Sequence, residues 1–191
     1  HIMRRRQRQM CIRDRYRDPA TNEYLPNLAT SYNWVDSKTL EFDLRKGVTF
    51  HNVEKFDADD VVYTLTYISN PENGAKPARN VNWWDSAEKL GDYKVRLNLT
   101  KEFPAALEFL SGPIVMYPNE YYAEVGPEGM AMKPVGTGPY AVTSVEPGKR
   151  YKFKKNNNYH ASSPKGQANI GNIVIRTIAE SNTQLAELFS G

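Results

Sequence analysis

Cysteine is almost missing from this sequence, which has only Cys11 among its 191 residues. A single thiol has no partner within the chain, so an internal disulfide is excluded and the redox compartment stays open. No apolar run approaches the roughly 18 residues that a membrane-spanning helix requires. With 40% hydrophobic and 12% aromatic residues, the composition is typical of a globular domain that is large enough to bury its own core.

Motifs of catalysis and metal binding are also missing. His51 and His160 have no cysteine or second histidine at ligand spacing, so they predict no metal site. No nucleophile elbow and no legible Ser-His-Asp or Cys-His arrangement occurs, so we expect no enzyme. Gly136-Thr137-Gly138 suggests a phosphate cradle, but no Lys-Ser/Thr follows it and Pro139 lacks a backbone donor. We therefore interpret it as a tight turn that lets backbone segments approach closely, and we expect no cofactor.

Charge is distributed unevenly along the chain. Residues 1–17 hold seven arginines and one acid, which leaves 18 basic and 21 acidic residues, a net charge of −3, for residues 18–191. A basic arm of this kind is compatible with nucleic-acid binding or a nuclear signal. His1-Ile2-Met3 instead looks like a cloning remnant, so we interpret residues 1–17 as a non-native leader, disordered and dispensable for folding. No apolar core follows the arginines, so no signal peptide is predicted.

The clearest local signals lie in residues 39–63. Leu40, Phe42 and Leu44 alternate with polar residues, which predicts a half-buried strand that forms a hairpin with residues 31–35.

An apolar helical pattern follows this strand. Asp57 suits the N-cap of the helix, and Asp59 and Asp60 are favourable near its positive end. The same three carboxylates are compatible with acid–base chemistry or a calcium site, but we favour capping. Val61 and Leu65 fall on one stripe, which predicts the face that packs on the core.

Weaker patterns predict the remaining elements. In chain order they are a polar loop over 70–82, a strand over 93–99, a short helix over 104–110, a glycine-rich loop over 125–129, a hairpin of 140–145 with 150–154, a strand over 170–178, and a helix after a capping box at 181–184. The strand over 170–178 is apolar on both faces, so we expect it inside a sheet that is covered on both sides.

Taken in order, these stretches resemble the family of extracytoplasmic solute-binding proteins that serve peptide and nickel ABC importers. The resemblance runs from about residue 24 to residue 191. The matching residues are Leu28-Ala29, Trp34, Asp36, Thr39-Leu40, Phe42, Leu44 to Val48, Phe50-His51, Phe56 to Tyr63, Pro134 to Tyr140, Glu146 to Gly148, Asn156 to Tyr159, Pro164, and Ile173 to Arg176.

The resemblance implies an α/β fold of mixed helices and sheets, a partial lobe like those of type II periplasmic binding proteins, with mixed sheets. Residues 18–191 are expected to form an incomplete first lobe. It would consist of a smaller subdomain at about 24–135 and a return into the main sheet at about 136–191, with the second lobe absent. For this family, a missing signal peptide implies a truncated start.

The function that the resemblance implies is the capture of peptides or similar small solutes for delivery to ABC permease subunits in the membrane. It also implies a periplasmic or lipid-anchored extracytoplasmic location and no nucleic-acid partner. Two alternatives stay open. One is the ligand-sensing domain of a transcription regulator, and the other is a nickel or haem carrier of the same family.

Candidate ligand contacts also follow from the resemblance, because members bind the ligand between two lobes. The loop after the first helix and the segment before the glycine turn approach that cleft, which suggests Trp83, Trp84 and Tyr117 as aromatic contacts. Thr137 and Gly138 would add polar contacts. The alternative for the three aromatic residues is a place in the core. The acidic residue that anchors the ligand amino group in peptide-binding relatives is expected outside these residues.

Overall fold

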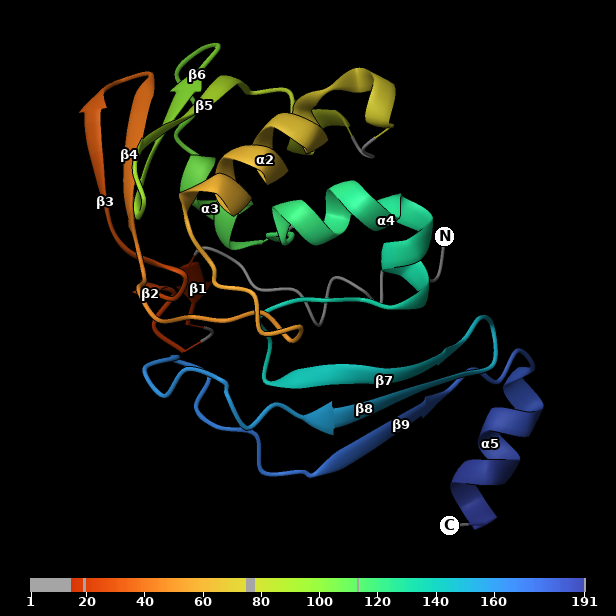
Figure 1. Cartoon of the computed structure of the whole chain (residues 1–191). Coiled ribbons are helices and arrows are strands. Elements are labelled where there is room, and N and C mark those ends of the chain that lie inside the picture. The colour runs from red at the N-terminus through yellow and green to blue at the C-terminus, as the bar shows by residue number, and fades with distance from the viewer. Residues whose placement is uncertain (1–14, 19, 75–77, 113, 191) are drawn as a thin grey trace.

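The computed structural model describes residues 15–18, 20–74, 78–112 and 114–190, whose arrangement Figure 1 shows. A four-stranded sheet carries helices on one side, and a three-stranded sheet formed by the last part of the chain lies beside them. The elements are β1 (Arg15–Arg17), β2 (Tyr24–Pro26), β3 (Ala29–Asp36), β4 (Thr39–Leu44), α2 (Ala58–Ser69), η1 (Pro71–Asn73), η2 (Ala78–Asn80), β5 (Trp84–Gly91), β6 (Lys94–Leu99), α3 (Ala106–Ser111), α4 (Asn119–Met132), β7 (Tyr140–Glu146), β8 (Arg150–Lys155), β9 (Asn172–Arg176) and α5 (Ser181–Ser190). The α/β class is confirmed, and every strand pair in the described part of the chain is antiparallel.

The four-stranded sheet has the order β3-β4-β6-β5 and contains both strands predicted for residues 39–44 and 93–99. Its inner face is apolar because Leu40 and Phe42 of β4 lie opposite Leu97 and Val95 of β6. All four side chains are at most 3% exposed. Burial of side chains of this size stabilises a fold by about 1.5–3 kcal/mol each. The predicted hairpin of β3 with β4 is confirmed as well.

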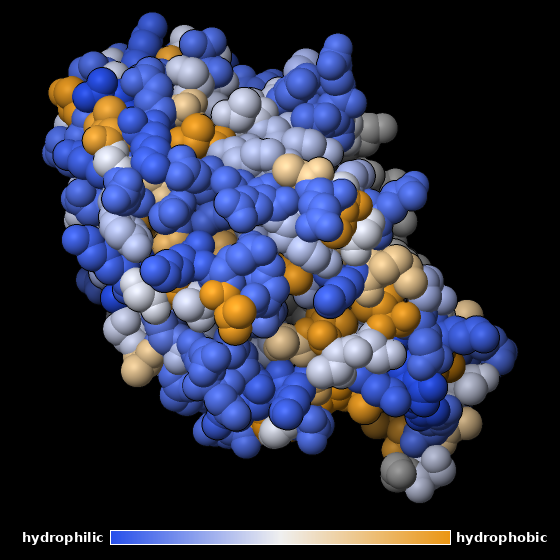
Figure 2. Space-filling view, viewed as in Figure 1, coloured by the Kyte–Doolittle hydropathy of each residue, from blue (hydrophilic) through white to orange (hydrophobic). Residues whose placement is uncertain are grey.

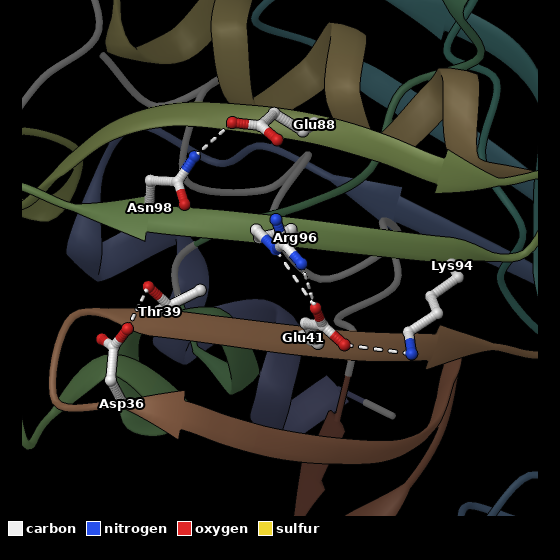
Figure 3. Close-up of polar contacts among 7 residues, drawn as sticks. All are labelled: Asp36, Thr39, Glu41, Glu88, Lys94, Arg96 and Asn98. Carbon is white, nitrogen blue, oxygen red and sulfur yellow. Dashed lines mark hydrogen bonds and ion pairs between the residues drawn. The ribbon is translucent and has the colours of Figure 1, made fainter.

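The outer face of this sheet is polar, and Figure 3 shows its cross-strand contacts. Glu41 of β4 accepts hydrogen bonds from Arg96 Nε at 3.1 Å and Nη2 at 2.7 Å, and pairs with Lys94 Nζ at 3.0 Å. Asn98 Nδ2 of β6 donates to Glu88 Oε1 of β5 at 2.6 Å. Since a slip of one residue would turn these groups into the core, the polar face helps to fix the register.

Helix α2 begins as the capping prediction requires. The Asp57 carboxylate accepts the Asp59 N–H at 2.8 Å, while Asp60 Oδ2 accepts the Asp57 N–H at 2.9 Å, which completes a capping box. Val61 and Leu65 are 2% and 1% exposed and belong to the core. The cap and the packing stripe are therefore both confirmed.

The expectation of a loop over 125–129 is wrong, because these residues lie within α4. Gly126 has non-helical angles (φ 65°, ψ −172°), and Pro127 follows it directly. A proline ring holds φ near the helical value, so it suits the first turn of a new helical segment. The glycine and the proline thus mark a kink between two helical pieces.

The last part of the chain forms the sheet β7-β8-β9 with the predicted hairpin of β7 and β8. Strand β9 pairs with β8 as an edge strand, and its Val174 is 56% exposed. The expectation of a strand covered on both sides is therefore wrong for the described residues. Helix α5 leaves Leu188 and Phe189 exposed at 75% and 84%, and Figure 2 shows hydrophobic surface near α5 and between α4 and β7.

The end of the basic leader has structure of its own. Arg15–Arg17 form strand β1, which pairs with β2, and Arg17 Nη1 contacts Glu108 Oε2 at 2.7 Å. The expectation that all of residues 1–17 are disordered is thus wrong at its last three positions, while residues 1–14 lie outside the described residues. None of the helices in the described ranges has the length and apolar character needed to cross a membrane.

Candidate functional site

Residues 24–135 contain the four-stranded sheet, and we call them the four-stranded subdomain. Trp83 and Trp84 lie in its core. They are 2% and 3% exposed, and their rings meet edge to face with centroids 4.7 Å apart. Trp83 also stacks on Phe103 at 4.7 Å, and its Nε1 donates to the Asn80 carbonyl at 2.9 Å. This burial supports the core alternative for both indoles, since neither presents a face to solvent in this arrangement.

Tyr117 is half-buried and belongs to a cluster of four tyrosines, Tyr63, Tyr67, Tyr117 and Tyr122, which we call the tyrosine cluster. Its ring centroid lies 4.6 Å from that of Tyr122, and its N–H donates to Thr64 Oγ1 at 2.9 Å. Burial, with a smaller contribution from Tyr67, raises the pKa of Tyr122, so this phenol stays neutral. Of the three aromatic candidates, Tyr117 alone keeps a partly exposed side chain.

Thr137 and Gly138 belong to residues 136–138, which we call the glycine bend. All three residues are buried. The close backbone approach predicted here is confirmed, because the His51 N–H donates to the Gly136 carbonyl at 2.8 Å. The His51 ring contacts the same bend: Gly136 N–H donates to Nδ1 at 3.3 Å, and Nε2 lies 2.9 Å from the Gly138 oxygen. Asn156 Nδ2 also donates to this oxygen, at 3.0 Å.

The five sequence-predicted residues therefore do not converge on one open surface. Trp83 packs on Phe103 and on Trp84 at the start of β5, and Tyr117 packs among tyrosines of α2 and α4. Thr137 and Gly138 lie where the four-stranded subdomain meets the three-stranded sheet. Whether any of them contacts a solute stays a prediction.

Sequence reasoning missed the special position of Asp60. Its side chain is buried, with 2% exposure, and links two helices: Oδ2 accepts the Asp57 N–H and Oδ1 accepts the Asn119 N–H, both at 2.9 Å. Burial raises the pKa of this carboxyl to about 6, although both hydrogen bonds favour the ionised form. The run Asp-Ala-Asp-Asp suggested a cap, but nothing in it marked one carboxylate as buried.

Arg45 makes a second contact between the four-stranded subdomain and the last part of the chain, through Ser162. Arg45 Nε donates to the Asn27 carbonyl at 2.7 Å, and its Nη1 donates to Ser162 Oγ at 2.8 Å. Burial, together with the charge of Arg45, lowers the pKa of His160 to about 4. Both His51 and His160 are therefore neutral at pH 7. Neither belongs to a group of three potential metal ligands within the described residues.

An open groove of about 580 Å³ lies between the three-stranded sheet and α5. Its charged lining is largely paired: Arg150 Nη2 contacts Glu146 Oε1 at 2.7 Å, and Arg176 pairs with Glu187. Because the two arginines already have carboxylate partners, the groove offers an ionic ligand little net charge. The groove was not predicted from the sequence.

Comparison with known proteins gives one consistent picture. A family model described as bacterial extracellular solute-binding proteins, family 5 (middle region), matches residues 23–191. The di/tripeptide-binding protein 1 of Pseudomonas aeruginosa is 27% identical over 190 residues, which cover 87% of this chain and 35% of that protein. The glutathione-binding protein GsiB of Pectobacterium atrosepticum is 31% identical over 166 residues, which cover 86% of this chain and 32% of that protein.

Solved structures give the same result. The crystal structure of NikZ from Campylobacter jejuni in complex with Ni(L-His) superposes with a TM-score of 0.83 at 27% identity, covering 95% of this chain and 36% of that one. The chain thus spans about a third of the length of the proteins that it matches.

Proposed function

Since this chain belongs to the family 5 bacterial extracellular solute-binding proteins, we propose that it contributes to the solute-binding component of an ABC import system. The observation that carries the proposal is the match of residues 23–191 to the family model, together with the fold that the chain shares with NikZ. The component would capture peptides or similar small solutes outside the cytoplasm and deliver them to a membrane permease.

Peptides are the solute class that the relatives favour. Two of the similar proteins are named for di- and tripeptides and for glutathione, which is itself a small peptide. A peptide ligand needs a site that satisfies its backbone amides and its charged ends while it tolerates different side chains. In the described part of the chain, the three partly exposed members of the tyrosine cluster are the candidates for such tolerant contact, since aromatic rings offer large area at low entropic cost.

The mechanism that we propose is closure of two lobes on the solute, with these residues as part of the first lobe. Binding would shift the population from an open to a closed form, and the permease would recognise the closed form. A preformed first lobe suits this role, because a wall that is already ordered loses less entropy on binding. The location that goes with this role is extracytoplasmic, either periplasmic or lipid-anchored.

A second candidate is a carrier of nickel complexes, which the likeness to NikZ favours. Such a solute would be a metal already chelated by a small molecule, so the protein would not need a ligand set of its own. A regulator's sensing domain finds no support among the relatives named here, all of which are binding proteins.

Isothermal titration of two proteins tests these proposals. One is the 191-residue chain, and the other is the longer product of the same gene, where the reading frame continues beyond these residues. The probes are a di- to pentapeptide mixture, glutathione, and nickel with excess histidine. We expect saturable binding of peptides at low micromolar concentration by the longer product only. The chain alone should bind weakly or not at all, because a factor of ten in affinity corresponds to only about 1.4 kcal/mol.

The outcomes separate the candidates. Binding of the nickel–histidine probe without peptide binding would favour the second candidate. Failure of the longer product to bind any probe would contradict the import proposal. Low-micromolar binding by the chain alone would contradict the two-lobed site, since the site would then lie wholly within these residues.

A further inference from the structure

His51 makes three polar contacts to one three-residue bend that lies 85 to 87 positions further along the chain. Its backbone N–H donates to the Gly136 carbonyl at 2.8 Å, its Nδ1 lies 3.3 Å from the Gly136 nitrogen, and its Nε2 lies 2.9 Å from the Gly138 oxygen. The histidine belongs to the segment that leads from β4 into α2, and the bend leads from α4 into β7. In Figure 1 this segment (orange) lies over the start of β7.

The two partners of the ring determine its protonation state. The Gly136 N–H is a donor only, so Nδ1 must accept and carries no proton. The Gly138 carbonyl is an acceptor only, so Nε2 must carry the proton. A neutral ring with its proton on Nε2 satisfies both contacts, whereas the other neutral tautomer would satisfy neither.

The bend is also held by a residue of the three-stranded part of the chain. Asn156, which directly follows β8, donates from Nδ2 to the Gly138 oxygen at 3.0 Å, and its N–H donates to the Pro139 carbonyl at 2.9 Å. The Gly138 oxygen therefore accepts one bond from the four-stranded subdomain and one from the three-stranded sheet, which fills both of its lone pairs.

We propose that His51 is a positioning residue that latches the four-stranded subdomain to the three-stranded sheet. It acts as the neutral Nε2-protonated tautomer and fixes the Gly136–Gly138 bend through both ring nitrogens. The proposal rests on this geometry alone and does not depend on which solute, if any, the protein binds. Its consequence is that residues 24–135 and 136–191 move as one lobe, although β3-β4-β6-β5 and β7-β8-β9 are separate sheets.

A different explanation of the same histidine is that its ring only fills space. Two substitutions distinguish the explanations because each retains one of the two polar contacts. The asparagine Oδ1 in His51→Asn lies near the place of Nδ1 and accepts from Gly136. The glutamine Nε2 in His51→Gln lies near the place of the ring Nε2 and donates to Gly138. Glutamine is the larger of the two, so a space-filling role favours it, whereas protection of the Gly136 amide by Nδ1 favours asparagine.

Amide hydrogen exchange of the isotope-labelled 191-residue chain, read by NMR at Gly136, provides the test. We expect exchange about tenfold faster in His51→Gln and His51→Ala than in the wild type, and within about threefold of the wild type in His51→Asn. Asn156→Ala is the matched control, because it removes a donor to Gly138 without touching the Gly136 N–H, and it should leave this exchange rate unchanged. Equal or better protection in His51→Gln than in His51→Asn would overturn the latch.

A measurement on the unaltered chain covers the case in which the variants fail to fold. A long-range proton–nitrogen spectrum identifies which ring nitrogen of His51 carries the proton at neutral pH. A proton on Nε2 supports the latch, and a proton on Nδ1 or on both nitrogens contradicts it.

Discussion

Replacing Asp60 by asparagine should remove a pH dependence from the stability of this protein. The wild-type carboxylate is 2% exposed and accepts the N–H groups of Asp57 and Asn119 at 2.9 Å each. It therefore joins the start of α2 to the start of α4. Asparagine keeps one acceptor but turns an amide group toward the other N–H, and this lost hydrogen bond should cost the variant about 1–3 kcal/mol before the pH-dependent difference is added.

The Asp60 carboxyl group also makes the stability of the wild type depend on pH, and its shifted pKa gives the direction of this dependence. Burial raises the pKa of Asp60 from 3.8 to about 6. Between these values the folded protein holds a proton that the unfolded chain has released, so stability from this group is fully present below about pH 3.8 and is lost as the pH rises through 6. A difference of about two pH units, at about 1.4 kcal/mol each, amounts to about 3 kcal/mol. Asp57 and Glu54 act in the same direction, since their negative charges also favour the protonated form.

Urea unfolding of the wild type and Asp60→Asn from pH 4 to pH 8 measures this effect. The stability of the wild type relative to the variant should fall by about 3 kcal/mol over this range, and the comparison cancels the contributions of His51 and His160. Asp59→Asn is the matched control, because it removes a charge from the same helical turn at an exposed carboxylate, which pairs with Lys89 at 2.8 Å. Parallel curves for the wild type and Asp60→Asn would show that burial does not hold a proton on this group.

Four further substitutions have simpler outcomes in urea unfolding at pH 7. Asp57→Ala removes the N-cap of α2 and should cost about 0.5–2 kcal/mol, and a cost near zero would contradict the cap. Leu97→Ala opens a cavity in the core at a fully buried position and should cost about 2–5 kcal/mol. Leu90→Ala, at a position that is 40% exposed, should change stability by less than about 0.5 kcal/mol, and equal costs for the two leucines would contradict the assigned core. Arg17→Ala removes an exposed ion pair with Glu108 and should cost less than about 1 kcal/mol, and a larger loss would mean that β1 is part of the folding unit.

The sequence predicted a helix or strand correctly where residues within that element determine its structure. The alternation of Leu40, Phe42 and Leu44 predicted β4, and Asp57 predicted the start of α2, because strand periodicity and capping act within a few residues. Helix α4 was not predicted, because a glycine followed by a proline, as at Gly126 and Pro127, is typical of a loop. Only packing of both helical pieces, with Tyr122 and Met130 buried, shows that they form a kink.

The candidate site was less predictable because its contacts join distant parts of the chain. Asp60 becomes a buried linker only when Asn119, 59 positions away, lies against it. Trp83 and Trp84 looked suitable for ligand contact as adjacent aromatics at the end of a loop, but Phe103 and Phe109 follow in sequence and cover Trp83. An aromatic pair has the same sequence signature in a core and in a binding wall.

The glycine bend illustrates how one motif served two interpretations. Gly136-Thr137-Gly138 was interpreted both as a close backbone approach and as a source of polar contacts to a solute. The Gly138 oxygen accepts hydrogen bonds from His51 and Asn156, so it has no lone pair left for a ligand. A solute donor could therefore bind this oxygen only if one of these two bonds broke, and a solute contact through Thr137 stays a prediction. Under the latch that we propose, these two bonds fix the four-stranded subdomain to the three-stranded sheet, as a lobe that closes as a rigid body would require.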